Sequence, residues 1–251
     1  AASDAELATS RSEPVGAEID AKSMRASIVH AFLLLLVLLY TVLADAVLTF
    51  FDCRKLADDT WSLVASPDRR CFDGWWYGWL PVASVAMLAY VIGIPAFVVL
   101  KVRRNRHRLN DPVFAARYGS LYLRYRTSNA AWEGVVLVRK LLVLTAAKLV
   151  STNNPSLQAT LVLGVLVVAM RFQDVYQPMV LKDLNQLEAI LLYLSVGILL
   201  VGVNFASAEA SPGTALYWSM TFVVWVMIGL SLLVLFWAVG RFFVRDRFLG
   251  G

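Results

Sequence analysis

The stretch Ser27–Phe51 reads SIVHAFLLLLVLLYTVLADAVLTFF, and its only acidic or basic side chains are His30 and Asp45. A helix needs roughly 20 apolar residues to cross the ~30 Å hydrocarbon layer of a membrane. Because lipid offers the backbone no hydrogen-bond partners, a segment of this length must satisfy its own backbone groups, as a helix does. The stretch therefore predicts a transmembrane helix.

Five more apolar windows follow along the chain: Trp76–Leu100, Trp132–Val150, Leu157–Tyr176, Leu187–Ser207 and Leu216–Phe242. The chain has 251 residues, of which 59% are hydrophobic and 16% charged, whereas a soluble domain carries about 25% charge. We therefore expect an all-α, polytopic membrane bundle of six transmembrane helices. The expected organisation is a polar N-terminal segment, disordered or linker, in residues 1–26, the bundle in 27–242, and a short basic tail in 243–251.

Positive charge is divided unevenly between the gaps. Sixteen Lys and Arg residues lie in the N-terminal segment, in every second gap and in the tail, whereas the alternate gaps hold four. The positive-inside rule then predicts that both termini lie on the inner side. The net charge of +5 sits beside apolar spans, so the expected partners are membrane lipids and other membrane subunits or copies of this chain, with no nucleic acid.

The two cysteines, Cys53 and Cys71, both lie in the gap after the first window. The charge pattern places this gap on the outer side, where disulfides persist. We therefore expect a disulfide, worth about 3 kcal/mol in the chain-entropy model; two unpaired thiols are the alternative. Two Cys with no nearby His cannot fill a tetrahedral metal site, so no metal is expected.

A dense basic run, Lys101–Arg108, follows the second window and leads to Asp111-Pro112, the cap and first position of a predicted helix. Its apolar residues share one face, which is typical of an amphipathic helix on the inner leaflet. The predicted contacts to anionic lipid headgroups are Arg103, Arg104, Arg106, Arg108, Arg117 and Arg124. Topology-setting charge with a simple anchor, regulatory lipid binding and docking to a partner subunit all remain open.

Five charged residues lie in or beside the windows: Asp45, Glu133, Arg139, Lys140 and Glu188. Charge inside a membrane is costly, so such residues are usually paired or functional. Lys140 is expected near the middle of the bilayer, with Asp45, Glu188 or a backbone carbonyl as partner. Lys140 is therefore expected either to form a structural salt bridge or to take part in transport. Asp45 can instead reach the outer headgroups, and Glu188 can cap its helix.

Several motifs occur in one order: Phe51-Asp52-Cys53-Arg54, Tyr90-Val91-Ile92-Gly93-Ile94-Pro95, Arg117-Tyr118-Gly119-Ser120-Leu121-Tyr122, Trp132-Glu133 and Leu187-Glu188. From about Phe51 to Glu188 this set resembles the TRP-like transmembrane region of large protist and algal surface proteins. The resemblance implies an integral membrane protein of a channel-like or sensory superfamily. The chain departs from it in lacking the ephrin-receptor-like or EGF-like cysteine-rich ectodomain that such proteins often carry.

The gap Ala208–Ala215 between the last two windows is too short for a pore helix and a selectivity filter. The sequence shows no phosphate loop and no metalloprotease or triad pattern, so we predict no enzyme activity and no cofactor. Two functions remain: a channel-like or sensory role without a conventional pore loop, or a non-catalytic structural or accessory subunit of a larger membrane assembly. A plasma or ciliary membrane is favoured, with an organellar membrane as the alternative.

Overall fold

A computed structural model describes residues 13–56, 59–149, 155–207 and 215–249. The helices are α2 (Glu13–Thr49), α3 (Gly74–Ala86), α4 (Gly93–Arg104), α5 (Pro112–Tyr122), α6 (Trp132–Leu149), α7 (Pro155–Tyr176), α8 (Lys182–Ser207) and α9 (Ala215–Leu249). The π-helical segment η1 (Met87–Ile92) joins α3 to α4, and two short 3₁₀ turns are η2 (Arg106–Arg108) and η3 (Thr127–Asn129). Strands β1 (Cys53–Lys55), β2 (Trp61–Leu63) and β3 (Ser66–Arg70) form a small antiparallel sheet.

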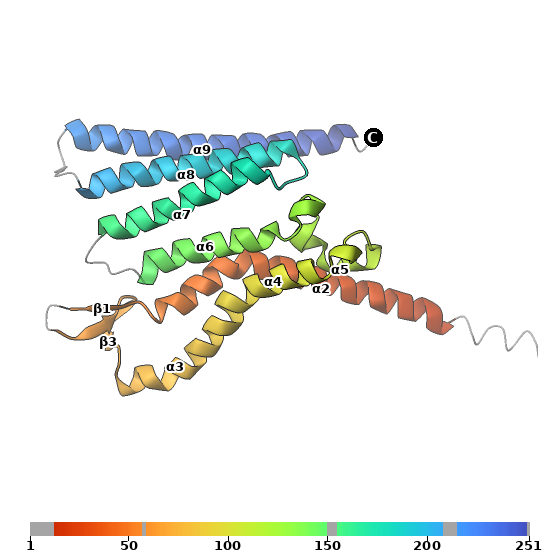
Figure 1. The fold of residues 1–251 in the computed structure, drawn as a ribbon, viewed down its shortest axis with the longest axis horizontal. Coiled ribbons are helices and arrows are strands. Elements are labelled where there is room, and N and C mark those ends of the chain that lie inside the picture. Colours follow the sequence, from red (N-terminus) through yellow and green to blue (C-terminus); the bar gives the residue numbers. More distant parts are fainter. Residues whose placement is uncertain (1–12, 57–58, 150–154, 208–214, 250–251) are drawn as a thin grey trace, which may run out of the picture.

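The helices form a layered bundle, in which α9, α8, α7 and α6 lie side by side in this order and α2 and α4 pack beyond α6 (Figure 1). The sheet lies at one end of the bundle, and α5 lies at the other (Figure 1). The start of α2 and the end of α9 lie at the same end as α5. The chain therefore gathers its loops into two opposite ends, separated by long apolar helices.

Five helical segments are long and apolar enough to cross a membrane: Met24–Thr49, Gly74–Arg104, Leu157–Tyr176, Lys182–Val203 and Tyr217–Trp237. These agree with five of the six predicted windows and support the predicted all-α membrane class. The sixth window is also a helix, α6, but its 18 residues contain Glu133, Arg139, Lys140 and Lys148. Its charge sets α6 apart from the other five, and its crossing of the membrane stays a prediction.

The ends of the bundle differ from the sequence-based expectation. Helix α2 begins at Glu13, so helix covers residues 13–26, which were expected to be disordered or linker; residues 1–12 lie outside the described part. Helix α9 continues to Leu249, so the predicted basic tail is an extension of the last helix. Both helices reach beyond their apolar windows.

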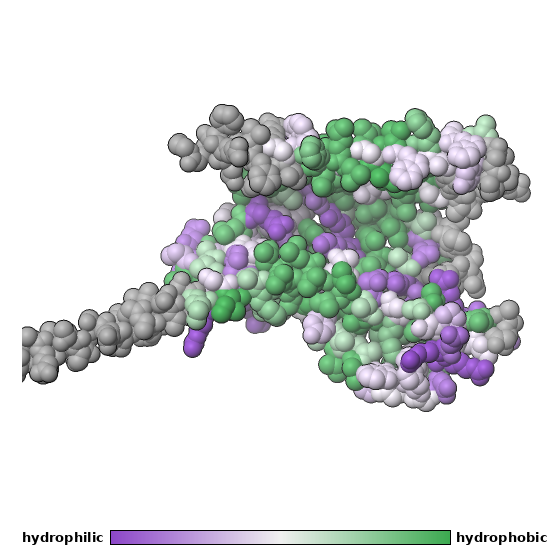
Figure 2. Space-filling model, turned by 180° about the vertical axis from the view of Figure 1, so that it is seen from behind, coloured by the Kyte–Doolittle hydropathy of each residue, from purple (hydrophilic) through white to green (hydrophobic). Residues whose placement is uncertain are grey.

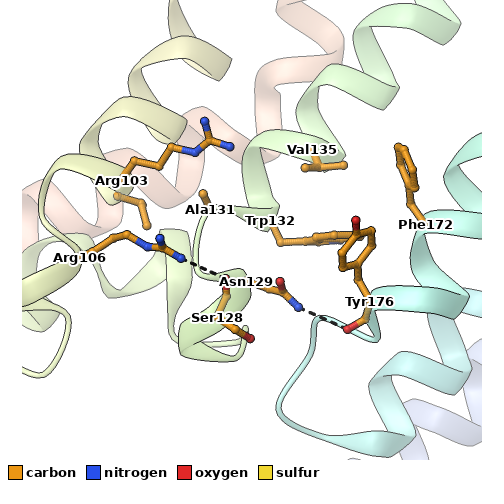
Figure 3. A pocket seen from close by; sticks show the side chains of 10 residues that line it. Arg103, Arg106, Ser128, Asn129, Ala131, Trp132, Val135, Phe172 and Tyr176 are labelled. Carbon is orange, nitrogen blue, oxygen red and sulfur yellow. Dashed lines mark hydrogen bonds between the residues drawn. The ribbon is translucent and has the colours of Figure 1, made fainter.

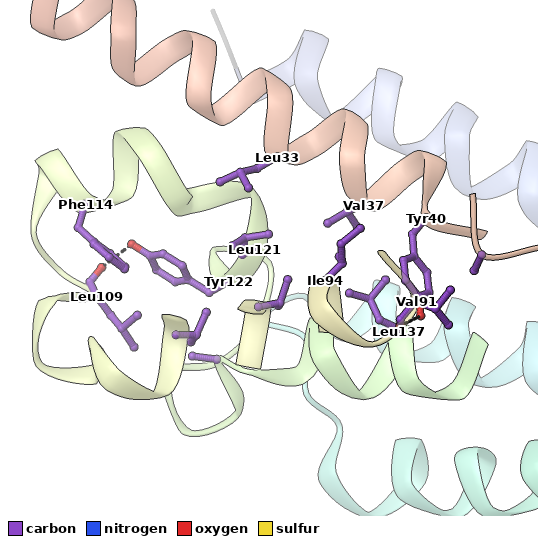
Figure 4. Close-up of a cluster of buried hydrophobic side chains, with 14 residues drawn as sticks. Leu33, Val37, Tyr40, Val91, Ile94, Leu109, Phe114, Leu121, Tyr122 and Leu137 are labelled. Atoms are coloured by element: carbon purple, nitrogen blue, oxygen red, sulfur yellow. Dashed lines mark hydrogen bonds between the residues drawn. The ribbon is translucent and has the colours of Figure 1, made fainter. Parts of the chain in front are cut away.

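Helix α5 forms where predicted, and the Asp111 carboxylate accepts a hydrogen bond from the Val113 N–H at 3.0 Å. Its apolar face was expected to lie on the inner leaflet, but it packs against other helices. Phe114, Leu121 and Tyr122 are buried in the same core as residues of α2, α4 and α6, and the Tyr122 hydroxyl donates to the Leu109 carbonyl at 2.9 Å (Figure 4). This face therefore packs against protein rather than lying open to the inner leaflet.

The central core explains the irregular turn in the second span. Pro95 has no N–H to donate to the carbonyl of Val91, four residues earlier. The Tyr40 hydroxyl of α2 donates to that carbonyl at 2.9 Å, and both residues are buried (Figure 4). In the π-helical turn the Gly93 N–H bonds Leu88 O, from which a Cβ on Gly93 would lie only 2.9 Å. Glycine and proline together thus produce the π-helical turn, and tyrosine satisfies the carbonyl that proline leaves free.

Candidate functional site

Two connections at the end of the bundle that carries α5 are joined backbone to backbone (Figure 1). The Arg126 N–H donates to Pro178 O at 2.8 Å and the Val180 N–H donates to Arg124 O at 3.1 Å. These bonds tie the α5–α6 connection to the α7–α8 connection. The start of α6 and the end of α7 are therefore held at a fixed separation, at the end of the bundle that carries α5.

Glu133, in the first turn of α6, is buried beneath this junction. The buried Tyr125 hydroxyl donates to Glu133 Oε2 at 2.8 Å, and the exposed Arg124 guanidinium lies 3.9 Å from the same oxygen. Burial, and then the charge of Glu133, raise the pKa of the Tyr125 phenol far above its ordinary value. The phenol therefore stays protonated and serves as a fixed donor. The site holds a negative charge at a helix N-terminus, where that charge is favourable.

A second buried polar group closes the α7–α8 turn. The Asn185 side chain accepts from the Met179 N–H at 3.0 Å and donates to the Met179 carbonyl at 2.9 Å. Gln173 of α7, also buried, donates to Asn185 Oδ1 at 3.3 Å. Buried amides of this kind are nearly always satisfied, because an unpaired one is costly. Here they fix the angle at which α8 leaves α7.

Arg139 and Glu188, two of the residues singled out in the sequence, form an ion pair. The Arg139 guanidinium lies 2.7 Å from Glu188 Oε1, and both side chains are mostly shielded from solvent. The pair joins α6 to α8. Glu188 is therefore an inter-helix partner, and the capping role considered for it is not needed to explain its position.

Asp45 also forms an inter-helix ion pair, but with a different partner from those expected. Lys148 Nζ, at the outer end of α6, lies 3.2 Å from Asp45 Oδ1 and 3.1 Å from the Thr49 hydroxyl. Lys148 therefore joins α6 to α2. Asp45 therefore has an inter-helix partner, but that partner is Lys148 and not the predicted Lys140.

Lys140 does not form the predicted salt bridge. Its side chain is half-buried on α6, and it makes no ion pair or hydrogen bond with any residue in the described part of the chain. Both expected carboxylates are occupied, Asp45 by Lys148 and Glu188 by Arg139. Lys140 is therefore a cation without a counter-charge in the part of the protein described here.

The predicted headgroup arginines separate into different environments, although all six side chains are exposed. Arg108 pairs with Asp111 at 3.0 Å, and this hydrogen bond is the main reason that the pKa of the Asp111 carboxyl lies below its ordinary value. Arg124 lies near Glu133. Arg103 and Arg106 face one cavity beside α6, whereas Arg104 and Arg117 do not line it.

The predicted disulfide between Cys53 and Cys71 is present. Cys71 is buried with Leu63 and Trp76, and the ring of Trp76 stacks on Phe50 with 5.5 Å between centroids. The three-stranded sheet of this loop was not predicted, because its strands are too short to show a period. Among the described residues, no group of three His, Cys, Asp or Glu side chains could hold a metal ion.

Sequence reasoning missed several polar residues that organise the inner half. Neither Tyr125, as the donor to Glu133, nor Gln173, as the donor to Asn185, was predicted from the sequence. Gln173 lies near the end of its span, next to Arg171 and Asp174. An uncharged polar residue in a span is a usable signal for a hydrogen bond between helices.

Comparison with protein-family models, with curated proteins and with solved structures finds no match for this chain.

Proposed function

We propose that this protein is a multi-pass membrane protein with both termini on the inner side, and that it acts as a non-catalytic subunit of a larger membrane assembly. The observation that carries the proposal is that Lys140 has no counter-charge among the described residues. An ammonium group near the middle of a membrane helix costs about 2.5–3.5 kcal/mol on insertion scales. A counter-charge from another subunit would remove much of this cost.

The other intramembrane charges support the same proposal. Asp45, Lys148, Arg139 and Glu188 are used to join helices. These four side chains are engaged with one another rather than with a solute. Their arrangement favours a structural role over a relay of charged sites across the bundle.

Helix α9 supplies a surface on which a partner could pack. It packs against α8, and none of the residues in its apolar window is buried. Its exposed aromatic residues Trp218, Phe222, Trp225 and Phe236 recur at helical spacing, with exposed fractions from 64% to 81%. Aromatic side chains of this kind are enriched at the centres of interfaces.

The test is a comparison of assembly size in a mild detergent. Wild-type protein is expected to migrate as part of a stoichiometric complex, whereas Lys140→Met, which keeps the length of the side chain and removes its charge, is expected to migrate as a single chain. Lys140→Met should also make the isolated chain more stable by about 1 kcal/mol or more, since it removes an unpaired charge. Val138→Met, at an exposed position of the same helix, is the control. Unchanged complex size for Lys140→Met, or a wild-type protein that is itself monomeric, would contradict the proposal.

A channel-like or sensory role is the second candidate. The observation that favours it is η1, because π-helical turns inside helices are frequent at functional sites. Reconstitution of the purified chain with current recording separates the two candidates. Current from the chain alone would favour the channel, and no current from a correctly assembled chain would exclude it.

A plasma or ciliary membrane is the location that we propose. The disulfide of the sheet-bearing loop is the supporting observation, because such bonds persist on the non-cytosolic side of membranes of the secretory route.

A further inference from the structure

The strongest unassigned feature is a cavity of about 670 Å³ at the inner end of the bundle. Arg103 of α4 and Arg106 of η2 point toward it from one side, while Phe172 and Tyr176 of α7 form the opposite wall (Figure 3). Trp132 lies between the walls, 5.7 Å from the Tyr176 ring. The cavity therefore has a cationic side and an aromatic side.

A second cavity, of about 450 Å³, continues from the first along α6 and α7. The two share Trp132, Val135 and Phe172 in their linings. Beyond these residues, the second cavity is lined mainly by apolar side chains as far as Leu142 on α6 and Leu161 on α7. Figure 2 shows the corresponding hollow between the two halves of the molecule, with hydrophilic and hydrophobic residues both visible in it.

The length of this groove matches one leaflet of a membrane. At 1.5 Å per residue, the turns of α6 from Trp132 to Leu142 rise about 15 Å, which is about half of the ~30 Å hydrocarbon thickness. The groove therefore begins at the arginines and extends to a depth that one acyl chain of the same leaflet would reach.

No described residue neutralises the cationic end of the groove. No Asp or Glu lines the first cavity among the described residues. Arg103 has no hydrogen bond or ion pair with the described residues, and Arg106 donates to the Ser128 carbonyl at 3.3 Å. Guanidinium groups bind phosphate oxygens with strong, charge-assisted hydrogen bonds. An anion with a phosphate group is the ligand that this end fits.

Two features keep the groove open. The inner ends of α6 and α7 are held apart by the backbone junction of the two connections and by the Asn129 amide, which donates to the Tyr176 carbonyl at 3.3 Å. Farther along, Gly164 of α7 lines the groove, and a Cβ on Gly164 would meet no atom within 4 Å. The space at this position is therefore not filled by a neighbouring side chain.

We propose that this groove binds one anionic glycerophospholipid of the inner leaflet, with its phosphate between Arg103 and Arg106 and one acyl chain between α6 and α7. This binding site goes beyond the proposed subunit role and does not depend on a partner protein. The sequence predicted headgroup contacts for all six arginines. The proposed site involves only two of them, Arg103 and Arg106.

The test measures binding of phosphatidylglycerol and of phosphatidylcholine to the purified chain in neutral detergent by native mass spectrometry. Arg103→Gln with Arg106→Gln is expected to weaken phosphatidylglycerol binding by about tenfold or more, and Arg104→Gln with Arg117→Gln is the matched control with the same loss of charge. Gly164→Leu is expected to weaken binding of the same lipid by filling the groove. Gly202→Leu, where a Cβ also meets no atom within 4 Å, is its control on α8.

Equal losses in the two arginine pairs would mean diffuse surface charge and would overturn the proposal. Unchanged binding in Gly164→Leu, with thermal unfolding like that of wild type, would also overturn it, because the acyl chain would lie elsewhere. Competition by inorganic phosphate as effective as that by the lipid would indicate a free-anion site instead. Co-purification of a protein segment that excludes the lipid from wild-type protein would assign the groove to a partner helix and would overturn the proposal.

Discussion

The Val91 carbonyl is one of several buried polar groups in this bundle that find a hydrogen-bond partner. Its carbonyl is deprived of a helical donor by Pro95, and Tyr40 supplies the donor from another helix. Glu133 is likewise held by the Tyr125 hydroxyl, and Asn185 by Met179 and Gln173. In each case a polar group that would be costly in a low-dielectric interior is satisfied by another residue of the chain. The partner is 51 positions away for Val91, but only 6 to 12 positions away for Glu133 and Asn185.

Tyr40→Phe should destabilise the protein by about 1 kcal/mol, because it leaves the buried Val91 carbonyl without a partner while keeping the ring in the core. Thermal unfolding in detergent measures the effect. Tyr90→Phe, at an exposed position on the neighbouring span, should leave the unfolding temperature unchanged. Equal shifts for the two variants would show that the Tyr40 hydrogen bond contributes nothing specific.

Arg139→Gln and Glu188→Gln should each destabilise the bundle by about 1–3 kcal/mol, since each leaves a largely shielded charge without its partner. The double variant should lose less than the sum of the two. A double-mutant cycle of unfolding free energies should therefore give a coupling of about 0.5 kcal/mol or more. The exposed pair Lys55–Asp59 is the comparison and should show a coupling near zero. Additive losses for Arg139 and Glu188 would mean that their contact does not stabilise the bundle.

Among the elements, α6 is the one that connects the others. It has four charged residues among its 18, and its polar side chains reach α2 through Lys148 and α8 through Arg139. Gly134 permits its close approach to α4, since a Cβ there would overlap the Val99 side chain. The outer sheet is held by a separate cluster of aromatic residues around the disulfide. The bundle and the outer loop therefore depend on different interactions.

Replacement of Cys53 and Cys71 together by Ser should lower the stability of the outer loop by about 3 kcal/mol, because the open chain gains conformational freedom in its unfolded state. The expected result is rapid tryptic cleavage after Arg69 or Arg70, which lie exposed on β3. Cleavage in the membrane helices should remain as slow as in wild type, because the bundle core does not include the loop. A loop that resists trypsin equally with and without the disulfide would contradict this prediction.

At the scale of the whole molecule, the sheet and α5 lie at opposite ends of one layered bundle (Figure 1). The inner connections are joined into one unit by backbone hydrogen bonds, and the groove between α6 and α7 opens beside that unit. The arrangement places Arg103, Arg106 and the hydrogen-bonded connections at one end of the bundle and the disulfide-bonded sheet at the other.

The proposed orientation can be tested by acceptor sites for N-glycosylation, which occurs only on the outer side of the secretory membrane system. Asp58→Asn completes an acceptor with Asp59 and Thr60, and the proposed topology expects this variant to be glycosylated. Arg126→Asn completes an acceptor with Thr127 and Ser128 in an inner connection and should remain unmodified. Electrophoretic mobility before and after glycosidase treatment measures both. Glycosylation of the Arg126→Asn variant but not of the Asp58→Asn variant would show that the chain has the opposite orientation.

The apolar windows, the disulfide and the cap of α5 could be predicted because each is a local property of the chain. Helix pairing through charge could be predicted only in part. Arg139 and Glu188 were both singled out, but not as a pair, and Lys148 replaced Lys140 as the partner of Asp45. Spacing along α6 shows which residues share a face, but not which helix that face meets.

The sequence by itself determined that the chain forms long apolar helices able to cross a membrane, because about 20 apolar residues in succession leave the backbone one favourable conformation in lipid. Only the tertiary structure decided how the helices are ordered, because apolar side chains pack against lipid as readily as against each other. It showed that the apolar face of α5 is buried in the core, that Lys140 lacks a counter-charge among the described residues, and that Arg103 and Arg106 share one cavity. These are relations between distant parts of the chain, which no local pattern contains.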